Sequence, residues 1–256
     1  MLASSSSGNA TFIAAGNTRI LVDAGLSRRE TFQRLAAIGE RGEDLDAVLV
    51  THEHTDHVCG LLPLLKKLNA NNRRVPVYMS RLTAPTIAWN DYTPPLETFQ
   101  AGERISIGAM EIDTFTIPHD ATDPVGFAVR ASGIKIGIVT DLGYMPESVK
   151  FHLRQTDLMV LESNHDIEML KVGPYPWSVK QRVMGRHGHL SNEVVSDFIC
   201  DGLDSRLSTL VLGHLSEHNN HPAIVRVTAS QALQQRSLAT RLVIAEPGKQ
   251  SEVFWF

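Results

Sequence analysis

Short apolar runs alternate with amphipathic stretches along most of the chain, which is typical of a protein that mixes strands with helices. Residues 45–50 are apolar apart from Asp46 and predict a buried strand. Residues 11–15 and 18–23, joined by Gly16-Asn17, predict a hairpin. We expect the remaining strands at residues 75–79, 104–107, 110–117, 125–131, 134–140, 158–162, 209–212, 241–245 and 252–255.

Apolar residues at helical spacing predict several helices. Ser27-Arg28-Arg29-Glu30 has the spacing of a capping box, and the apolar residues after it give the helix a buried face that ends at Gly39. Residues 58–68 carry leucines along one helical face. Further helices are expected at residues 80–89, 146–154, 192–200 and 222–236. Two segments that contain proline, residues 90–100 and 171–188, are expected to be irregular.

This order of elements predicts an α+β fold. Each half of the chain mixes strands with a few helices, which favours an αββα four-layer sandwich of two sheets covered by helices on both outer faces. The chain has 256 residues and shows no internal repeat, low-complexity run or linker. We therefore expect one domain over residues 1–256.

Composition narrows the class of protein without naming a function. A hydrophobic share of 43% and a charged share of 20% are ordinary for a soluble protein, and a net charge of −4 gives no overall attraction to nucleic acid. Cys59 and Cys200 are too isolated to predict a disulfide framework or a thiolate zinc site. Residues 1–8 lack the features of an export signal, and no run approaches the roughly 18 apolar residues of a membrane span. A cytoplasmic protein without a membrane partner is expected.

The most informative motif is Thr51-His52-Glu53-His54-Thr55-Asp56-His57, which places three imidazoles and two carboxylates on a short loop. The loop leaves a predicted strand and enters a predicted helix, the usual position of ligand sites in α/β sheets. Imidazole and carboxylate together suit zinc, manganese or iron. The motif therefore predicts a metal site.

Further ligands are expected at the ends of other buried strands. His119, Asp141 and His214 each stand directly after an apolar run, where a polar side chain is least needed for packing. Each alone would more often be a turn or cap residue than a ligand. Together with the histidine-rich loop, they are predicted to complete the metal site.

The chain resembles the metallo-β-lactamase-fold hydrolases, in particular the YycJ/WalJ-type members related to ribonucleases J and Z. The resemblance rests on the histidine-rich loop and on six shorter motifs: Ser6-Ser7-Gly8-Asn9-Ala10-Thr11, Pro118-His119-Asp120-Ala121, Thr140-Asp141-Leu142-Gly143, Glu162-Ser163-Asn164-His165-Asp166, Gly188-His189-Leu190-Ser191-Asn192 and Leu212-Gly213-His214-Leu215-Ser216. It implies seven ligands for two divalent ions, Zn²⁺ or Mn²⁺: His52, His54 and His119 for one, Asp56, His57 and His214 for the other, and Asp141 between them.

Such a site suggests a mechanism. Two divalent ions about 3.5–4 Å apart can share a water, lower its pKa toward about 7 and offset charge on a phosphoryl oxygen. Asp56 is expected to bind one ion and to orient the resulting hydroxide. His165 and His189 are candidates for supplying a proton to the leaving group. The alternative is that His165 caps a strand end and that His189 only precedes a helix N-cap.

A cationic stretch is a candidate substrate surface. Lys180, Arg182 and Arg186 lie in a segment without acidic residues, where Tyr175 and Trp177 interleave. This combination suits a phosphate backbone and stacked bases. A solvated loop is the competing interpretation.

Three functional hypotheses follow. The resemblance implies a nuclease that cleaves phosphodiester bonds of nucleic acid, with DNA favoured, and specifically a 5′–3′ exonuclease. A small-molecule phosphodiesterase acting on cyclic nucleotides or phosphonate esters is the alternative, because the compact chain has no inserted clamp domain. A regulatory binding module with a residual metal site is a third, which the full ligand set argues against. Monomer and homodimer both remain open.

Overall fold

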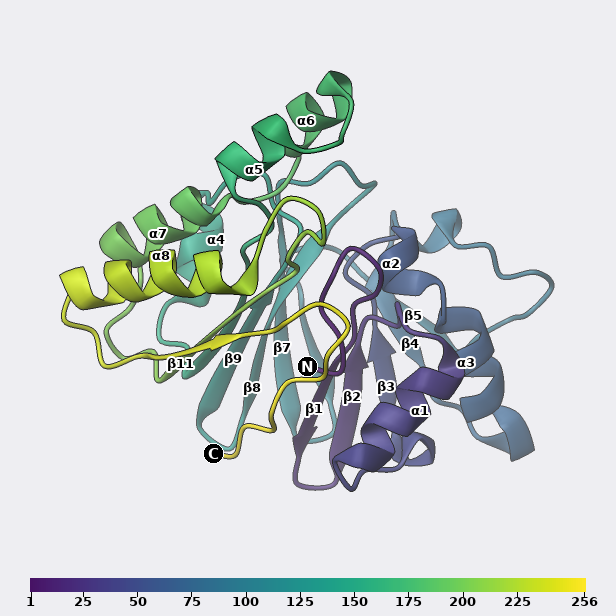
Figure 1. Cartoon of the computed structure of the whole chain (residues 1–256). Coiled ribbons are helices and arrows are strands. Elements are labelled where there is room, and N and C mark those ends of the chain that lie inside the picture. The colour runs from purple at the N-terminus through teal and green to yellow at the C-terminus, as the bar shows by residue number, and fades with distance from the viewer.

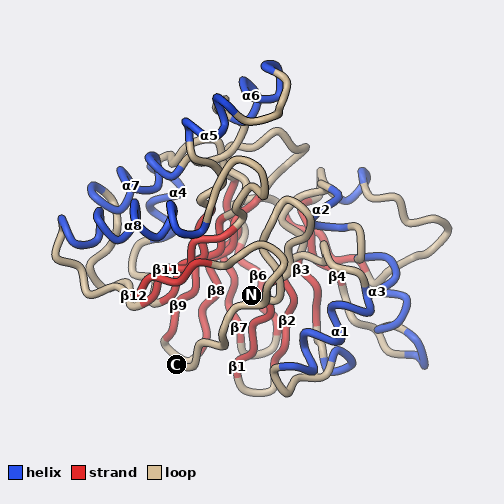
Figure 2. The backbone as a smooth tube through the Cα atoms, in the orientation of Figure 1, coloured by secondary structure: helices blue, strands red, loops and turns tan.

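Two β-sheets pack face to face in the computed structural model, which describes residues 1–256 apart from the side chain of Asn71 (Figures 1 and 2). The five-stranded sheet runs in the order β1 (Thr11–Ala15), β2 (Thr18–Val22), β3 (Ala47–Leu49), β4 (Val77–Ser80) and β5 (Leu96–Phe99). The seven-stranded sheet runs in the order β12 (Arg241–Ile244), β11 (Thr209–Gly213), β10 (Leu158–Glu162), β9 (Ile134–Val139), β8 (Val125–Ala131), β7 (Met110–Thr116) and β6 (Arg104–Ile107).

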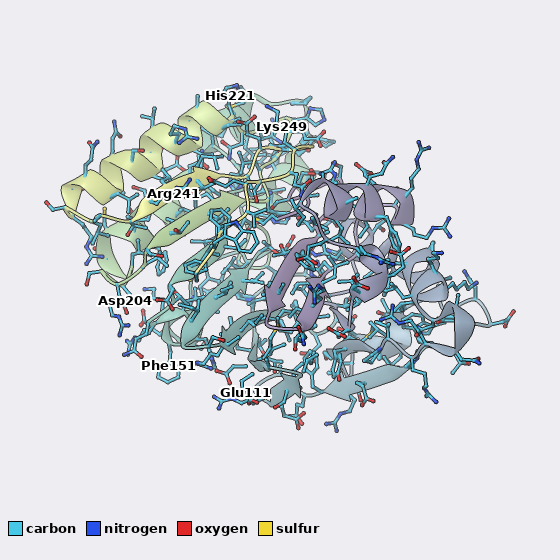
Figure 3. All side chains as sticks on the ribbon, turned by 90° about the horizontal axis from the view of Figure 1, so that it is seen from below. Glu111, Phe151, Asp204, His221, Arg241 and Lys249 are labelled. Atoms are coloured by element: carbon cyan, nitrogen blue, oxygen red, sulfur yellow. The ribbon has the colours of Figure 1, made fainter. Side chains whose placement is uncertain are left out.

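Helices cover the outer faces of both sheets. α1 (Arg28–Ala37), α2 (Thr55–Val58) and α3 (Leu61–Leu68) belong to the five-stranded half. α4 (Glu147–Leu153), α5 (Ile167–Val172), α6 (Trp177–Val183), α7 (Asn192–Asp201) and α8 (Pro222–Gln235) belong to the other half. In the view from below, α8 and α1 lie on opposite sides of the sheets (Figure 3). The predicted αββα sandwich is confirmed.

Three apolar layers hold the sandwich together. A central core lies between the sheets and includes Ile20 from β2 and Phe127 from β8, both fully buried. Leu35 and Leu64 belong to the core under α1 and α3, and Phe198 to the core under α4, α7 and α8. Burial on both faces explains why the central strands read as continuous apolar runs.

Local sequence explains several element boundaries. Gly16 has φ of +56°, which lets the β1–β2 hairpin turn at little steric cost. The hydroxyl of Ser27 accepts a hydrogen bond of 3.2 Å from the backbone N–H of Glu30, so the predicted cap of α1 is confirmed. None of the helices among the described residues is long and apolar enough to cross a membrane.

Four local predictions were wrong. Residues 80–89 form only a short 3₁₀ helix, Ala84–Thr86, and residues 252–255 run without strand pairing while Phe254 packs on the central core. The segment 90–100 contains β5, which pairs with β4 immediately after Pro95. Residues 171–188 contain α6, because the prolines of this segment precede the helix and do not interrupt it; Pro176 is its N-cap.

The strand directions decide where the site lies. β9, β10 and β11 are parallel, and β7 runs in the same direction because it is antiparallel to β8, as β8 is to β9. Their carboxyl ends therefore meet at one edge of the seven-stranded sheet. The loop after β3 approaches that edge from the other sheet (Figure 1).

Candidate metal centre

The histidine-rich loop leaves β3 and turns into α2, the short helix Thr55–Val58. A turn near residue 25 packs tightly against it. A Cβ atom on Gly25 would lie 1.7 Å from the carbonyl oxygen of Asp56, and one on Gly60 would lie 1.8 Å from the carbonyl oxygen of Leu26. Both glycines therefore allow a close backbone approach that no other residue would permit.

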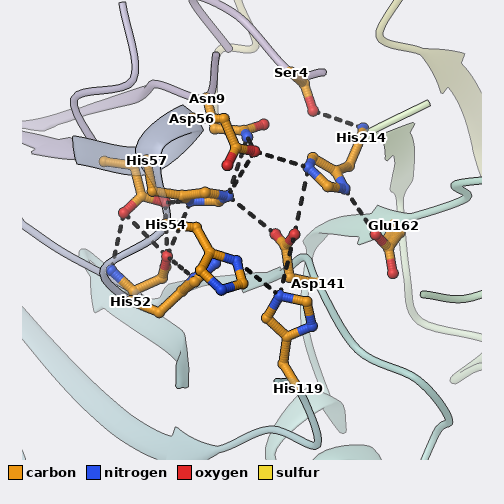
Figure 4. A network of polar contacts seen from close by, with 12 residues as sticks. Ser4, Asn9, His52, His54, Asp56, His57, His119, Asp141, Glu162 and His214 are labelled. Carbon is orange, nitrogen blue, oxygen red and sulfur yellow. Dashed lines mark hydrogen bonds and ion pairs between the residues drawn. The ribbon is translucent and has the colours of Figure 1, made fainter. Parts of the chain in front are cut away.

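Three histidines form the first ligand cluster (Figure 4). Nε2 of His119 lies 3.2 Å from Nδ1 of His54, and Nε2 of His52 is buried without a hydrogen-bond partner among the described side chains. The second ring nitrogens of two of these histidines have hydrogen-bond partners on the side away from the cluster. Nδ1 of His119 lies 3.2 Å from the Gly188 carbonyl oxygen, and Nδ1 of His52 lies 3.0 Å from the Thr51 hydroxyl. Three imidazole nitrogens thus converge on one point.

The second cluster combines two carboxylates with two histidines. Its ligand atoms, from Asp56, His57, Asp141 and His214, all lie within 4.8 Å of one another. Oδ2 of Asp56 lies 3.4 Å from Nε2 of His57 and 3.4 Å from Nε2 of His214. Two loops of the seven-stranded half and one of the five-stranded half supply these residues.

Asp141 stands between the clusters. Its Oδ2 lies 3.2 Å from Nε2 of His57, while its Oδ1 lies 3.4 Å from Nε2 of His214 and 3.9 Å from Nε2 of His119. Asp141 has φ of 62° and His214 has φ of 54°, a left-handed conformation that is uncommon for these residues. Such local strain is concentrated at functional sites.

Two buried carboxylates that sequence reasoning gave no role support the histidines of the second cluster. Oδ2 of Asp23 lies 2.8 Å from Nδ1 of His57. Oε1 of Glu162 lies 2.7 Å from Nδ1 of His214 and also 2.7 Å from Nδ1 of His189. Partners of this kind fix the tautomer and the ring orientation of a metal-binding histidine. The signal in the sequence was an acidic residue at the end of an apolar run.

Burial sets the charge of the first cluster. It lowers the pKa of His52 well below the usual value, and the neighbouring His57 acts in the same direction. Burial also lowers the pKa of His119. Both rings are therefore neutral near pH 7, with lone pairs available to a cation.

Carboxylates set the charge of the second cluster. Burial opposes protonation of His214, but Asp141, Asp56 and Glu162 together raise its pKa to about 10. Burial also opposes protonation of His57, yet Asp141 and Asp23 raise its pKa well above the usual value. Without a metal ion, protons on the histidines balance the carboxylates.

This donor set fits divalent metal ions. The converging atoms are imidazole nitrogens and carboxylate oxygens, which zinc and other divalent transition metals accept. The buried Nε2 of His52 has no hydrogen-bond partner within the described structure, so its lone pair is available to a metal ion. A cation would also replace the protons that the second cluster holds.

The two candidate proton donors differ in position. The ring of His189 lies between two ligand histidines, 5.2 Å from the ring of His119 and 5.4 Å from that of His214, and it is partly exposed. His165 is only 2% exposed, lies outside the ligand clusters, and has a pKa that burial lowers to about 4.

The three predicted substrate-binding cations lie in different environments. Lys180 is buried, and its Nζ donates a hydrogen bond of 2.7 Å to the Lys171 carbonyl oxygen. Nε of Arg182 lies 2.5 Å from Oδ2 of Asp120, so that charge is paired. The exposed guanidinium of Arg186 lies 4.4 Å from the centre of the Tyr144 ring.

Comparison with known proteins points to one family. A family model described as "Beta-lactamase superfamily domain" matches residues 18–206. The chain is 34% identical to the exodeoxyribonuclease YycJ of Bacillus anthracis over 239 residues, covering 92% of this chain and 89% of that protein. It is 33% identical to the exodeoxyribonuclease WalJ of Streptococcus pneumoniae over 243 residues, covering 93% and 88%.

A solved structure supports the fold independently. The metallo-β-lactamase fold protein YhfI of Bacillus subtilis superposes with a TM-score of 0.73 over 94% of this chain and 90% of that one, at 18% identity. At this identity the likeness concerns the fold alone.

Proposed function

This chain belongs to the β-lactamase superfamily, and from that premise we propose that it is a metal-dependent phosphodiesterase that degrades nucleic acid as an exonuclease. The observation that carries the proposal is Asp141, whose Oδ2 lies 3.2 Å from Nε2 of His57 in the second cluster and whose Oδ1 lies 3.9 Å from Nε2 of His119 in the first. DNA is the favoured substrate, because relatives at 33–34% identity are named exodeoxyribonucleases. The proposed direction, 5′–3′, follows the family resemblance alone.

We propose two bound ions, Zn²⁺ or Mn²⁺. The first cluster would hold one and the second cluster the other, and Asp141, which lies beside both clusters, would supply a carboxylate at the boundary between them. When bound, the ions supply an activated water and offset the charge that builds on the phosphoryl oxygens. Because the ligands come from loops of both sheets, we also propose that residues 1–256 act as one domain.

The side chains of this protein would orient the reacting groups. Asp56 faces the second cluster and is placed to accept a hydrogen bond from the attacking water. His189 is the stronger candidate for protonating the leaving oxygen, because Glu162 fixes its Nδ1 and leaves Nε2 free for a substrate. His165 is the weaker candidate, because its buried ring lies outside the clusters.

Of the three cations, Arg186 is the best placed for a substrate phosphate. No acidic side chain lies within 4 Å of its charged group in the part of the chain that the structure describes, and stacking on Tyr144 holds the guanidinium in place. Arg182 and Lys180 would contribute less, because Asp120 and a backbone carbonyl already occupy their donors.

A small-molecule phosphodiesterase remains the second candidate. The environments of Lys180 and Arg182 favour this candidate. Because Arg182 is paired with Asp120 and Lys180 is buried, little free positive charge remains near the clusters. A short phosphodiester needs few backbone contacts, whereas a nucleic-acid strand gains affinity from each neutralised phosphate.

One experiment separates the two. Purified protein with Mn²⁺ or Zn²⁺ is incubated with single- and double-stranded DNA and RNA labelled at the 5′ or 3′ end, and with bis(p-nitrophenyl) phosphate. We expect release of mononucleotides from DNA, with a 5′ label released first. Hydrolysis of the small ester without oligonucleotide cleavage at any salt concentration would favour the small-molecule candidate. An Asp141→Ala protein controls for contaminating nuclease.

A further inference from the structure

The N-terminal segment contacts ligands of the second cluster from both halves of the molecule. Asn9 and Ser4 lie on different sides of this cluster, beside Asp56 and His214 respectively (Figure 4). Asp56 follows a strand of the five-stranded sheet, and His214 follows a strand of the seven-stranded sheet. One short segment therefore touches ligands that belong to different sheets.

Asn9 fixes both the side chain and the backbone of Asp56. Its Nδ2 donates to Oδ2 of Asp56 at 3.0 Å and to the Ser5 carbonyl oxygen at 3.0 Å. Its backbone N–H donates to the Asp56 carbonyl oxygen at 2.8 Å. Nδ2 also lies 3.1 Å from Nε2 of His57, so the amide faces the point on which the ligands converge. The Ser5 carbonyl requires a donor here, which fixes the amide orientation.

Ser4 holds the backbone of His214. Its hydroxyl accepts a hydrogen bond of 2.7 Å from the His214 N–H, at a residue with left-handed φ. A Cβ atom on Gly213 would lie 2.6 Å from this hydroxyl, so the two segments are in close contact. Ser5 continues the contact by a parallel bridge to Leu215.

The segment is itself anchored outside the site. The Leu2 carbonyl oxygen accepts a hydrogen bond of 2.6 Å from Arg34 of α1. The Met1 amino group donates to the Ser251 hydroxyl at 2.7 Å, near the C-terminus. These anchors tie the segment to α1 and to the stretch around Ser251, outside the site.

We propose that residues 4–9 form a clasp in which Asn9 and Ser4 are positioning residues for the second ion. The clasp joins Asp56 to His214 through one short segment, so it sets their separation and thereby the affinity of the second cluster. This inference rests on the proposed dinuclear centre. It differs from the roles of Asp23 and Glu162, which orient individual histidine rings.

The test measures stepwise metal affinity in Asn9→Ala, Asn9→Asp and Ser4→Ala. Metal-free protein is titrated with Zn²⁺ in competition with a colorimetric chelator, and with Co²⁺ followed by its visible absorption. We expect the second ion to bind about 10–100-fold more weakly in Asn9→Ala, the range measured for partners of metal ligands, while the first step is unchanged. Asn9→Asp should lose more, because it replaces a donor by a charge like that of Asp56. Ser4→Ala should show a smaller loss in the same step.

Asn69→Ala is the matched control. The Asn69 side chain bonds the Val75 backbone and the Tyr92 hydroxyl, away from the clusters, so its loss should lower the melting temperature without altering either metal step. Unchanged second-ion affinity in all three clasp variants would overturn the proposal. A wild-type protein that binds fewer than two ions would instead refute the dinuclear centre, so the two failures are distinguishable.

Discussion

The first ligand cluster consists of desolvated histidines, whereas the second surrounds its histidines with carboxylates. Burial lowers the pKa of His52 and of His119, but Asp141 and its neighbours raise the pKa of His57 and of His214. The first cluster is therefore ready to accept a cation at neutral pH. The second must first release protons.

The clusters also differ in what supports them. The histidines of the first cluster have neutral hydrogen-bond partners, the Gly188 carbonyl and the Thr51 hydroxyl. The ligands of the second cluster are contacted by the carboxylates of Asp23 and Glu162 and by the amide of Asn9. Buried charges need such partners, because isolated ones are costly to desolvate. The second cluster therefore depends more on residues outside the ligand set.

The largest effect is expected from Asp141→Ala, which removes the carboxylate that lies between the two clusters. Hydrolysis of bis(p-nitrophenyl) phosphate should fall about a thousandfold or more, because the loss disturbs both ions at once. Bound metal, measured by mass spectrometry on chelator-free protein, should drop from about two ions per chain. Circular dichroism should show an intact fold. Turnover near that of wild type would exclude a bridging role for Asp141.

A pH titration of metal binding should separate the clusters next. His57 and His214 have raised pKa values, so in the metal-free protein they carry protons at pH 7 and release them when an ion binds. Affinity for the second ion should fall as pH falls, by up to about tenfold per pH unit for each displaced proton. His52 and His119 have lowered pKa values, so the first ion should show little pH dependence near neutrality.

Calorimetry in buffers of different ionisation enthalpy measures the protons released at each step. Equal release in both steps would contradict the assigned charges. In the metal-free protein, the raised pKa of His214 should also contribute to the free energy of unfolding. That contribution should be fully present below about pH 6.5 and should be lost as the pH rises through about 10.

The supporting carboxylates offer a third comparison. Glu162→Gln keeps the shape but removes the charge that faces His214 and His189, and Asp23→Asn does the same for His57. We expect second-ion affinity to fall about 10–100-fold in each, and the first step to remain. Only Glu162→Gln should also alter the pH profile of turnover, because only it contacts His189. Identical profiles for the two variants would argue against His189 as the proton donor.

Much of the site could be predicted because each ligand interrupts or follows an apolar run. His119, Asp141 and His214 stand where packing has no need of polarity, and the structure brings them to one edge of the sandwich. Asp23 and Glu162 follow apolar runs too, but a strand-terminal carboxylate reads equally well as a turn residue. Their roles depend on which ring lies opposite, which is a tertiary property.

Other elements depended on context that the sequence does not display. β5 pairs with β4 across residues 81–95, so its strand character comes from a neighbour and not from its own pattern. The cations of residues 171–188 looked equivalent, yet Lys180 is buried within α6, whereas Arg186 follows the helix and is exposed. Helix formation after Pro176 made that difference.

The smallest predicted effect distinguishes these cations. Arg186→Ala should weaken oligonucleotide binding several-fold and reduce the slope of log affinity against log salt by about 0.7–0.9, the value of one lost phosphate contact. Lys180→Gln should change the slope little, because its ammonium already bonds the Lys171 carbonyl oxygen. Reversal of charge at Lys180, Arg182 and Arg186 together should weaken binding further.

Fluorescence anisotropy of a labelled oligonucleotide at several salt concentrations measures these slopes, and turnover of bis(p-nitrophenyl) phosphate provides the control. The small ester makes no backbone contacts, so its turnover should be nearly unchanged in every one of these variants. A parallel loss of ester turnover would mean that Arg186 supports the metal centre through the Gly143–Arg186 backbone contact, where a Cβ on Gly143 would lie 2.4 Å from the Arg186 carbonyl. An unchanged salt slope in Arg186→Ala would remove this residue from the substrate surface and strengthen the case for a small phosphodiester.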